Sequence, residues 1–279
     1  MNLLLTLDEN YLPPCKVMLC SFFASNPNET DVTVYLLHSA IPGDKLEELT
    51  DFCALFGAKL RPVTVDTALF ENAPTSKRYP KEMYYRLLSP LILPQEVERV
   101  LYLDPDMLII NPLRALWELN LCGKTFAAAA HTGLTEMANE INQVRLDTEH
   151  EYFNSGVMLI NLHRLRMEQK SSDVFDYIES HRGKLILPDQ DIISGLYGDR
   201  IIPLDSYKYN MTERLFAFHI RIGDRMNIDY VRRNAVIIHY CGRNKPWKSG
   251  YVGKLNVFYD ETVQRMREQG YRTPEKTAE

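Results

Sequence analysis

The first 65 residues alternate between strand and helix patterns, and this alternation constrains the fold more than any other feature of the chain. Apolar runs at residues 3–7, 31–38 and 59–65 are typical of buried strands. The segments between them, residues 11–23 and 42–57, carry the spacing of helices. Strands that alternate with helices form parallel sheets with right-handed crossovers. We therefore predict an α/β protein with a mainly parallel sheet flanked by helices.

The pattern continues with less regularity through the rest of the chain. We expect further strands at residues 99–103, 124–130, 152–161 and 236–239. We expect further helices at residues 81–88, 112–119, 162–181, 189–197 and beyond 250. Residues 66–80 are predicted to form a loop. Residues 131–149 show neither a strand nor a helix period, so we expect a mobile active-site loop there.

Length, charge and cysteine usage narrow the class of protein. A chain of 279 residues with 45% hydrophobic residues suits one catalytic domain at 1–250, followed by a C-terminal helix and tail at 251–279. The net charge of −5, without a polybasic stretch, argues against a nucleic-acid partner. The five cysteines include no CxxC pair, which favours free thiols in a reducing compartment over a zinc site or disulfide framework.

The sequence carries no pattern of a membrane-spanning or exported segment. The apolar start is interrupted by Asp8 and Glu9, which leaves too short an apolar region for a signal peptide. No apolar run approaches the ~20 residues that a spanning helix needs. We expect a cytoplasmic protein, and peripheral contact with the inner face of the plasma membrane stays open.

Asp104-Pro105-Asp106 follows the predicted strand at residues 99–103, which is apolar on both faces. Residues i and i+2 of an extended segment point to the same side, so the two carboxylates can converge. Converging carboxylates repel unless a cation or protons neutralise them, and oxygen ligands suit Mg²⁺, Mn²⁺ or Ca²⁺. Ligands of open α/β sheets bind at the carboxyl ends of strands. The tripeptide is also good turn chemistry, so a plain turn remains the alternative.

Other polar segments accompany the aspartate pair in a fixed order. They are Thr6-Leu-Asp8-Glu-Asn10-Tyr11, Tyr102-Leu-Asp104-Pro-Asp106, Tyr152-Phe-Asn154-Ser-Gly156 with Asp189-Gln190-Asp191, and His239-Tyr-Cys-Gly242-Arg-Asn-Lys245-Pro-Trp247. Their order and their residue identities resemble those of the retaining glycosyltransferases of family 8, from residue 2 to about residue 250. The resemblance implies a GT-A-type, Rossmann-like mixed sheet with a small helical C-terminal elaboration.

The resemblance also assigns roles to individual residues. It implies that Asp104, Asp106 and His239 bind Mn²⁺, with Mg²⁺ as the alternative ion. It implies that the donor is bound by Thr6, Asp8, Asn10, Arg86, Asp104, Asp189, Gly242 and Lys245. It implies that Asn154, Asp189 and Gln190 lie at the reacting sugar, and Asp191 would support them from behind.

The reaction implied is transfer of glucose or galactose from a UDP-sugar to an acceptor hydroxyl, with retention of the α configuration. The acceptor would be a saccharide or glycolipid of a cell-surface glycan such as lipopolysaccharide. A double displacement needs a carboxylate nucleophile. Gln190 is an amide and a poor nucleophile, which favours attack from the face that the diphosphate leaves.

Each residue type also has an ordinary structural role, which the sequence leaves open. Asp8 and Asn10 could cap a helix. A lone histidine such as His239 is commonly a hydrogen-bonded core residue. Arg86 could form a surface ion pair, and Asn154 could serve a turn.

Some positions depart from the family or suggest other functions. His131 replaces an acidic residue that several relatives carry near the donor sugar, and the tail lacks a basic and aromatic membrane-binding run. Residues 72–80 and 243–252 are the expected acceptor-facing loops, but their composition names no acceptor. The alternatives are a non-catalytic nucleotide-sugar binding module, a metal-dependent phosphohydrolase, or self-glycosylation at Tyr251 or Tyr259.

Overall fold

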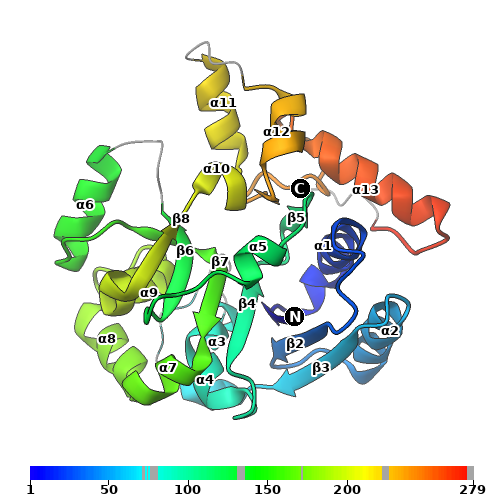
Figure 1. The fold of residues 1–279 in the computed structure, drawn as a ribbon. Helices are drawn as coiled ribbons and strands as arrows, with labels where there is room; N and C mark the ends of the chain where they lie inside the picture. Colours follow the sequence, from blue (N-terminus) through cyan, green and yellow to red (C-terminus); the bar gives the residue numbers. More distant parts are fainter. Residues whose placement is uncertain are drawn as a thin grey trace.

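The computed structural model describes residues 1–70, 73, 75, 81–130, 136–170, 172–221 and 226–274. A central sheet of seven strands runs through the molecule, with helices on either side (Figure 1). Its strands, in spatial order, are β3 (Lys59–Thr64), β2 (Thr33–His38), β1 (Asn2–Thr6), β4 (Arg99–Leu103), β7 (Phe153–Asn161), β6 (Phe126–Ala130) and β8 (Ile201–Leu204).

The sheet is mixed but mainly parallel. The first four strands are parallel to one another, and β6 is parallel to β8. Only β7 runs against its neighbours, β4 and β6. A second, two-stranded sheet pairs β5 (Met107–Ile109) with β9 (Ile237–His239) in antiparallel fashion. The predicted fold class is therefore confirmed.

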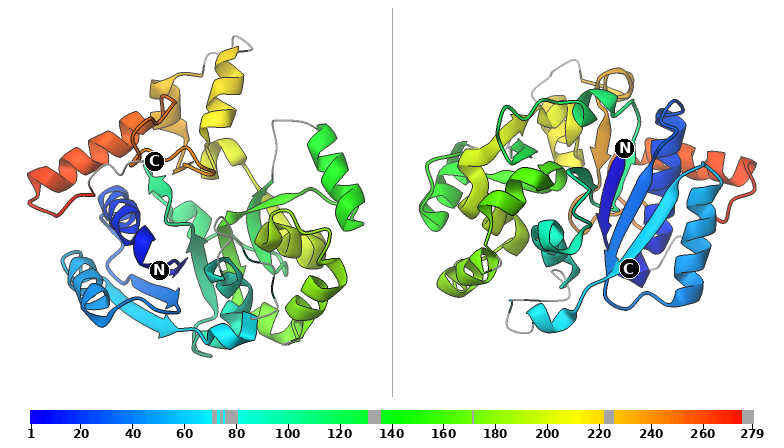
Figure 2. Two further views of the ribbon diagram at one scale, coloured as in Figure 1. Left: turned by 180° about the vertical axis from the view of Figure 1, so that it is seen from behind. Right: turned by 60° about the horizontal axis from the view of Figure 1, so that its bottom comes forward.

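Helices complete the layers on both faces of the large sheet (Figure 2). The α-helices are α1 (Leu12–Ser25), α2 (Gly43–Ala54), α3 (Glu82–Tyr85), α4 (Ser89–Ile92), α5 (Arg114–Trp117), α6 (Glu136–Leu146), α7 (Leu162–Glu168), α8 (Asp173–His181), α9 (Pro188–Tyr197), α10 (Ser206–Tyr209), α11 (Glu213–Arg221), α12 (Ile228–Asn234) and α13 (Asn256–Glu268). Short 3-10 turns lie at Glu9–Tyr11, Thr67–Phe70, Arg86–Leu88 and Gly198–Arg200. Among the described residues, no helix combines the length and the apolar character that a membrane crossing requires.

Alternating side chains of the central strands belong to two separate hydrophobic clusters, one on each face of the sheet. On β1, Leu3 and Leu5 join the cluster that α1, α2 and α13 cover, whereas Leu4 joins the cluster under α8 and α9. The same alternation puts Leu101 and Tyr102 of β4 on opposite faces. A strand buried on both faces must be apolar along its whole length. This explains why the strand patterns of the sequence read as continuous apolar runs.

Several predicted elements were wrong or missing. Residues 131–149 are not a loop throughout, because α6 occupies part of this range. The single helix expected at 162–181 is two helices, α7 and α8. Strands β5 and β8 and helices α10 to α12 were not predicted. His131 lies outside the described residues, as does most of the expected acceptor-facing loop 72–80.

Helix α6 escaped prediction because two of the apolar side chains described in it, Ile141 and Val144, face solvent. Ile141 is 61% exposed and Val144 is 83% exposed. A helical period in the sequence reflects an apolar face that packs on a core. Leu146, at the end of the helix, is 3% exposed, and Arg145, a charged residue, attaches the helix to the buried Asp191.

Helix α1 anchors the small sheet through two serines. The Ile109 amide of β5 donates to Ser21 Oγ at 2.9 Å, and Ser25 Oγ donates to the Ile109 carbonyl at 2.8 Å. Ser21 is 2% exposed and Ile109 is 1% exposed, so water cannot replace the bond between them. The position of β5, and with it that of β9, is therefore set by α1.

Replacing Ser21 with Ala should lower the free energy of unfolding by about 1–3 kcal/mol, because the buried Ile109 amide loses its acceptor. Urea denaturation measures the change. Thr50→Ala is the matched control, since the exposed Thr50 hydroxyl donates to the Leu46 carbonyl of its own helix. The control should change stability by less than about 0.5 kcal/mol. Equal losses in the two variants would contradict this role of Ser21.

Candidate functional site

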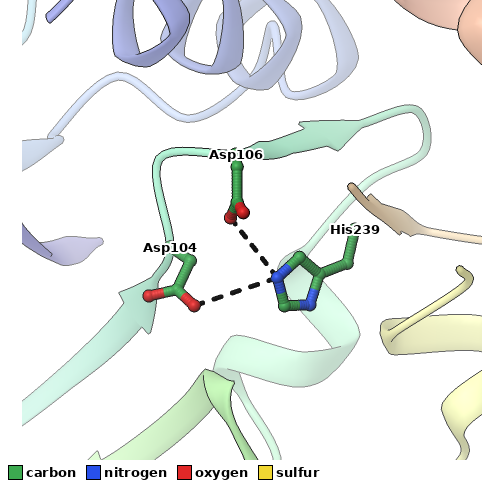
Figure 3. A group of neighbouring side chains, drawn as sticks. All are labelled: Asp104, Asp106 and His239. Carbon is green, nitrogen blue, oxygen red and sulfur yellow. Dashed lines mark ion pairs between the residues drawn. The ribbon is translucent and has the colours of Figure 1, made fainter. Parts of the chain in front are cut away.

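The candidate site forms where β4 leaves the large sheet. The chain passes from β4 through Asp104, Pro105 and Asp106 directly into β5, which pairs with β9 so that Met107 lies opposite His239. This pairing brings a histidine from the C-terminal third of the chain beside both aspartates (Figure 3). The ligand position that α/β folds favour, at the carboxyl ends of strands, therefore carries three potential metal ligands.

Asp104, Asp106 and His239 each direct a ligand atom to a common point. His239 Nε2 lies 3.3 Å from Asp106 Oδ1 and 3.8 Å from Asp104 Oδ2. One atom of each residue lies within 4.8 Å of the others. Asp106 Oδ1 is buried and has no hydrogen-bond partner within the described structure, which is unusual for a carboxylate oxygen. These atoms fit a divalent cation with mixed oxygen and nitrogen ligands.

A partner behind the ring orients His239 toward the aspartates. His239 Nδ1 lies 2.8 Å from Asn210 Oδ1, which can only accept a hydrogen bond. The Nδ1 atom therefore carries the proton in the neutral ring, and Nε2 keeps its lone pair. Metal-binding histidines typically have such a partner on the second nitrogen. The His239 side chain is 3% exposed, so it is also a core residue, and the two interpretations of this histidine coexist.

Lys245 compensates the charge of Asp106. Its ammonium forms an ion pair with Asp106 Oδ2 and donates to the Tyr240 carbonyl at 2.9 Å. Burial raises the pKa of Asp106, but Lys245 and His239 together lower it by more, so this pKa lies below its ordinary value. Burial lowers the pKa of Lys245, yet Asp106 raises it above the ordinary value. The pair therefore carries opposite charges at neutral pH.

Arg86 compensates Asp104 in the same way. Its guanidinium lies 2.9 Å from Asp104 Oδ1 and stacks 4.2 Å above the centre of the Tyr102 ring. The Tyr102 hydroxyl donates to Asp104 Oδ1 at 2.6 Å and lies 3.0 Å from Thr6 Oγ1. Arg86 is 7% exposed, so the alternative of a surface ion pair is wrong for this residue. Thr6 is thus connected to Asp104 through one tyrosine.

The start of α9 lies on the other side of Arg86. Asp189 Oδ2 accepts a hydrogen bond from Ser155 Oγ at 2.7 Å and lies 3.4 Å from the Arg86 guanidinium. Asn154 Nδ2 donates to Gln190 Oε1 at 3.1 Å. Burial raises the pKa of Asp189, and Arg86 and Ser155 offset only part of that effect. Strand β7 and helix α9 therefore hold these residues jointly against the aspartate pair.

Asp8, Asn10 and Gly242 lie at exposed edges of the site. Asp8 Oδ1 accepts from the Tyr11 amide at 3.2 Å, which is the capping role that its position suggested. Asn10 Nδ2 donates to Asp8 Oδ2 at 3.2 Å. Gly242 has a φ of +86°, a conformation that favours glycine, and begins the turn that leads to Lys245.

A single cleft of about 1610 Å³ connects these groups. The residues predicted to bind the metal, the donor or the reacting sugar all line it, namely Thr6, Asp8, Asn10, Arg86, Asp104, Asp106, Asn154, Asp189, Gln190, His239, Gly242 and Lys245. A cleft of this size holds a ligand larger than a typical drug-sized molecule. The structure therefore brings together segments that are more than 200 residues apart in the chain.

Comparison with known proteins shows to which family the chain belongs. The model of glycosyl transferase family 8 matches residues 2–250. The chain belongs to glycosyl transferase family 8. General stress protein A of Bacillus subtilis is 30% identical over 89% of this chain and 88% of that protein. A lipopolysaccharide 1,2-glucosyltransferase of Escherichia coli is 26% identical over 86% of this chain and 71% of that protein.

A solved structure shares the fold. It is the galactosyltransferase LgtC in complex with donor and acceptor sugar analogues, and it superposes with a TM-score of 0.80. The match covers 95% of this chain and 96% of that one at 23% sequence identity. The arrangement of strands and helices is therefore the GT-A-type fold that the sequence resemblance implied.

Sequence reasoning missed several residues that hold the family 8 site in place. Tyr102, Ser155 and Asn210 each contact a predicted site residue, and Arg145 and Tyr152 contact Asp191. Tyr102 and Ser155 stand inside the quoted motifs, so their position was the available signal. Asn210 and Arg145 belong to no motif, and only the fold brings them to the site.

Asp191 supports the start of α9 from behind, as its sequence position suggested. Its carboxylate is fully buried and accepts from the Arg145 guanidinium at 2.8 and 2.6 Å and from the Tyr152 hydroxyl at 2.7 Å. The amides of Ile186 and Leu187 also donate to it, at 2.6 and 3.0 Å. This network fixes the turn that presents Asp189 and Gln190.

Arg145→Met should lower the free energy of unfolding by about 3–5 kcal/mol, because it leaves the Asp191 carboxylate buried without its cation. The double variant Arg145→Met/Asp191→Asn should recover part of the loss. Arg164→Met is the control, since its ion pair with Glu168 is 46% exposed on the arginine side and should contribute about 0.5 kcal/mol or less. Guanidinium denaturation measures all three. A double variant no more stable than the single one would contradict the charge-burial explanation.

Gly156 provides the space in which the three-residue cluster fits. A Cβ atom at this position would lie 2.6 Å from His239 Cε1 and 2.8 Å from both Asp104 Oδ2 and Met107 Cε. Two of these three atoms belong to the potential ligands. A glycine is therefore required here by close approach.

If the cluster holds a divalent cation, Gly156→Ala should weaken its binding by at least about tenfold, because displacements of about 1 Å can cost that much or more in a preorganised site. Isothermal titration with Mn²⁺ measures it. Gly43→Ala is the control, because a Cβ there meets nothing within 4 Å. Equal Mn²⁺ affinities in the two variants would rule out this steric role.

Proposed function

We propose that this family 8 chain is a Mn²⁺-dependent, α-retaining hexosyltransferase that transfers glucose or galactose from a UDP-sugar to a hydroxyl of a saccharide or glycolipid. The observation that carries the proposal is the Asp104, Asp106 and His239 cluster in the cleft, with one buried carboxylate oxygen that lacks a partner. Families of this kind need a cation at the diphosphate because charge develops there as the sugar leaves.

The metal would be held by Asp104, Asp106 and His239. Mixed imidazole and carboxylate ligands favour Mn²⁺ over Ca²⁺, and Mg²⁺ is the alternative ion. When bound, the ion would stabilise negative charge on the diphosphate oxygens. The pair of aspartates suits this task because Arg86 and Lys245 already balance the carboxylates, which leaves the ion's charge available for the diphosphate.

The chain's own residues would bind and orient the donor. Thr6, Asp8 and Asn10 would hold the uridine, since their oxygen and amide groups suit a base edge and ribose hydroxyls. The Lys245 ammonium and the backbone at Gly242 would face the diphosphate, where a point charge and a close amide approach are both useful.

The geometry around Asp189 and Gln190 supports attack from the face that the diphosphate leaves. The Asp189 carboxylate is engaged by Ser155 and Arg86, so it is a poor nucleophile for a double displacement. In the proposed step, the acceptor oxygen bonds to the anomeric carbon while the bond from that carbon to the diphosphate oxygen breaks. The acceptor proton passes to the diphosphate. Asn154 and Gln190 would hold the sugar during this exchange. A glycosyl-enzyme on Asp189 or Gln190, seen by intact mass spectrometry, would contradict it.

The donor sugar and the setting are the remaining parts of the proposal. Relatives include a lipopolysaccharide 1,2-glucosyltransferase and the galactosyltransferase LgtC, so both hexoses are proposed. We propose transfer to a cell-surface glycan on the cytoplasmic side. Self-glycosylation is disfavoured because Tyr259 is 4% exposed, and the Tyr251 hydroxyl donates to Glu213 at 2.6 Å. The complete ligand cluster argues against a non-catalytic binding module.

Thermal shift with UDP, UDP-glucose, UDP-galactose and GDP-mannose, each with and without Mn²⁺, tests the proposal. One UDP-hexose should stabilise the protein by about 2.7 kcal/mol at 100 times its dissociation constant. The stabilisation should require Mn²⁺ and be lost in Asp106→Asn, together with transfer of the hexose. A folded protein that responds to no uridine nucleotide would exclude the proposed site. Transfer that survives in Asp106→Asn would exclude the metal assignment.

A further inference from the structure

One wall of the cleft is positively charged, although the chain as a whole has a net charge of −5. This wall comes from residues 206–250, the region that includes α10, α11 and α12 at one end of the large sheet (Figure 1). Beyond His239 and Lys245, its cleft-lining residues include Arg214, Arg243 and Lys248. Within the described residues, this region contributes neither aspartate nor glutamate to the cleft.

These three cations have no side-chain partner in the part of the chain that the structure describes. The ion pairs found among the described residues include none with Arg214, Arg243 or Lys248, and none of these side chains makes a hydrogen bond there. Arg214 and Arg243 are exposed, and Lys248 is half-buried. In contrast, other cations of the cleft are taken: Arg86 pairs with Asp104, Lys245 with Asp106, and Lys16 with Glu48. Among the described cations of the cleft, those without an ion pair or side-chain hydrogen bond are Arg214, Arg243 and Lys248 on this wall and Arg272 near the end of the described chain.

The residues next to Arg214 and Arg243 hydrogen-bond to a common segment of the chain. Next to Arg214, the Glu213 carboxylate accepts from the Tyr251 hydroxyl at 2.6 Å and the Leu255 amide at 2.5 Å. Next to Arg243, the Asn244 side chain exchanges hydrogen bonds with the backbone of Val252, at 2.6 and 3.0 Å. Glu213 and Asn244, the neighbours of the two arginines, thus both hydrogen-bond to residues 251–255. Both bonds go to Glu213 Oε1, and no ion pair joins Glu213 to Arg214 among the described residues.

From this wall we infer that the acceptor is an anionic saccharide, one that carries a phosphate or carboxylate group, and that Arg214 and Arg243 bind this group with Lys248 nearby. The inference rests on the proposed transferase function and specifies its acceptor. Arginine suits the task because its planar fork binds either anion through paired hydrogen bonds.

The acceptor is a better match for these cations than the donor diphosphate. In the proposed function the diphosphate is already met by the metal that Asp104, Asp106 and His239 would hold. Arg214 comes from α11, a separate element, and Arg243 opens the 243–252 segment, which the sequence predicted to face the acceptor. The cleft as a whole carries both signs of charge, but its 206–250 wall is cationic, and a surface of one sign attracts oppositely charged substrates. The local field would therefore draw in an anionic acceptor that the net charge of the whole chain repels.

Calorimetric titration of the full chain, saturated with UDP and Mn²⁺ at low salt, tests this inference. The probes are glucose 6-phosphate, glucuronate and glucose. At least one anionic sugar should bind about tenfold or more tightly than glucose, the size expected for a hydrogen bond to a charged group. Arg214→Gln and Arg243→Gln should each reduce this preference toward that of glucose. A preference for the phosphate or for the carboxylate identifies which anion the acceptor carries.

Arg221→Gln and Lys254→Gln are matched controls, since both side chains are exposed and neither lines the cleft. The controls should keep the wild-type preference for the anionic sugar. Glucose binding as tightly as both anionic sugars would overturn the inference, and so would an anionic preference that both arginine variants retain. Failure of UDP and Mn²⁺ to bind at the outset would instead defeat the proposed function, and the acceptor inference with it.

Discussion

The site depends on how two adjacent carboxylates are kept charged inside the protein. Asp106 is 9% exposed and Asp104 is only partly exposed, so each needs a compensating cation. Lys245, which is remote in sequence, supplies it for Asp106, and Arg86, from the preceding helical segment, supplies it for Asp104. Removing a partner from such a pair leaves an uncompensated buried charge. The positions of β9, α9 and the Gly242 turn are therefore tied to the aspartate pair.

A short two-stranded sheet sets the positions of the residues around the two carboxylates. Strand β5 begins directly after Asp106, and β9 ends at His239, so three ladder pairs fix the histidine beside the aspartates. Helix α1 holds β5 through Ser21 and Ser25, and Asn210 sets the orientation of the imidazole. Ligand sites need supporting residues of this kind because loose side chains lose binding strength. The support here comes from backbone pairing and not from a flexible loop.

Sequence patterns predicted the elements whose burial leaves a regular run of apolar residues and missed the elements that leave no such run. The strands of the large sheet are apolar on both faces, and most were found because burial on both faces leaves a continuous apolar run. Strand β5 was missed because three residues are too few for a pattern, and α6 because Ile141 and Val144 are exposed and Arg145 attaches the helix to Asp191. Residue type alone also left the roles of Asp8 and Arg86 open. An aspartate at the position of Asp8 suits either a helix cap or a ligand contact, and an arginine such as Arg86 suits either a surface or a buried ion pair.

The sequence by itself determined the alternation of strands and helices, the two aspartates at a strand end and the family to which the chain belongs, because these depend on local spacing and residue identity. Only the tertiary structure decided which side chains meet. Asn210 reaches His239, Arg145 reaches Asp191 and Gly156 leaves room for the cluster because the topology brings distant segments together. The cationic wall was decided in the same way, since a charged residue is free or paired only according to its neighbours in space.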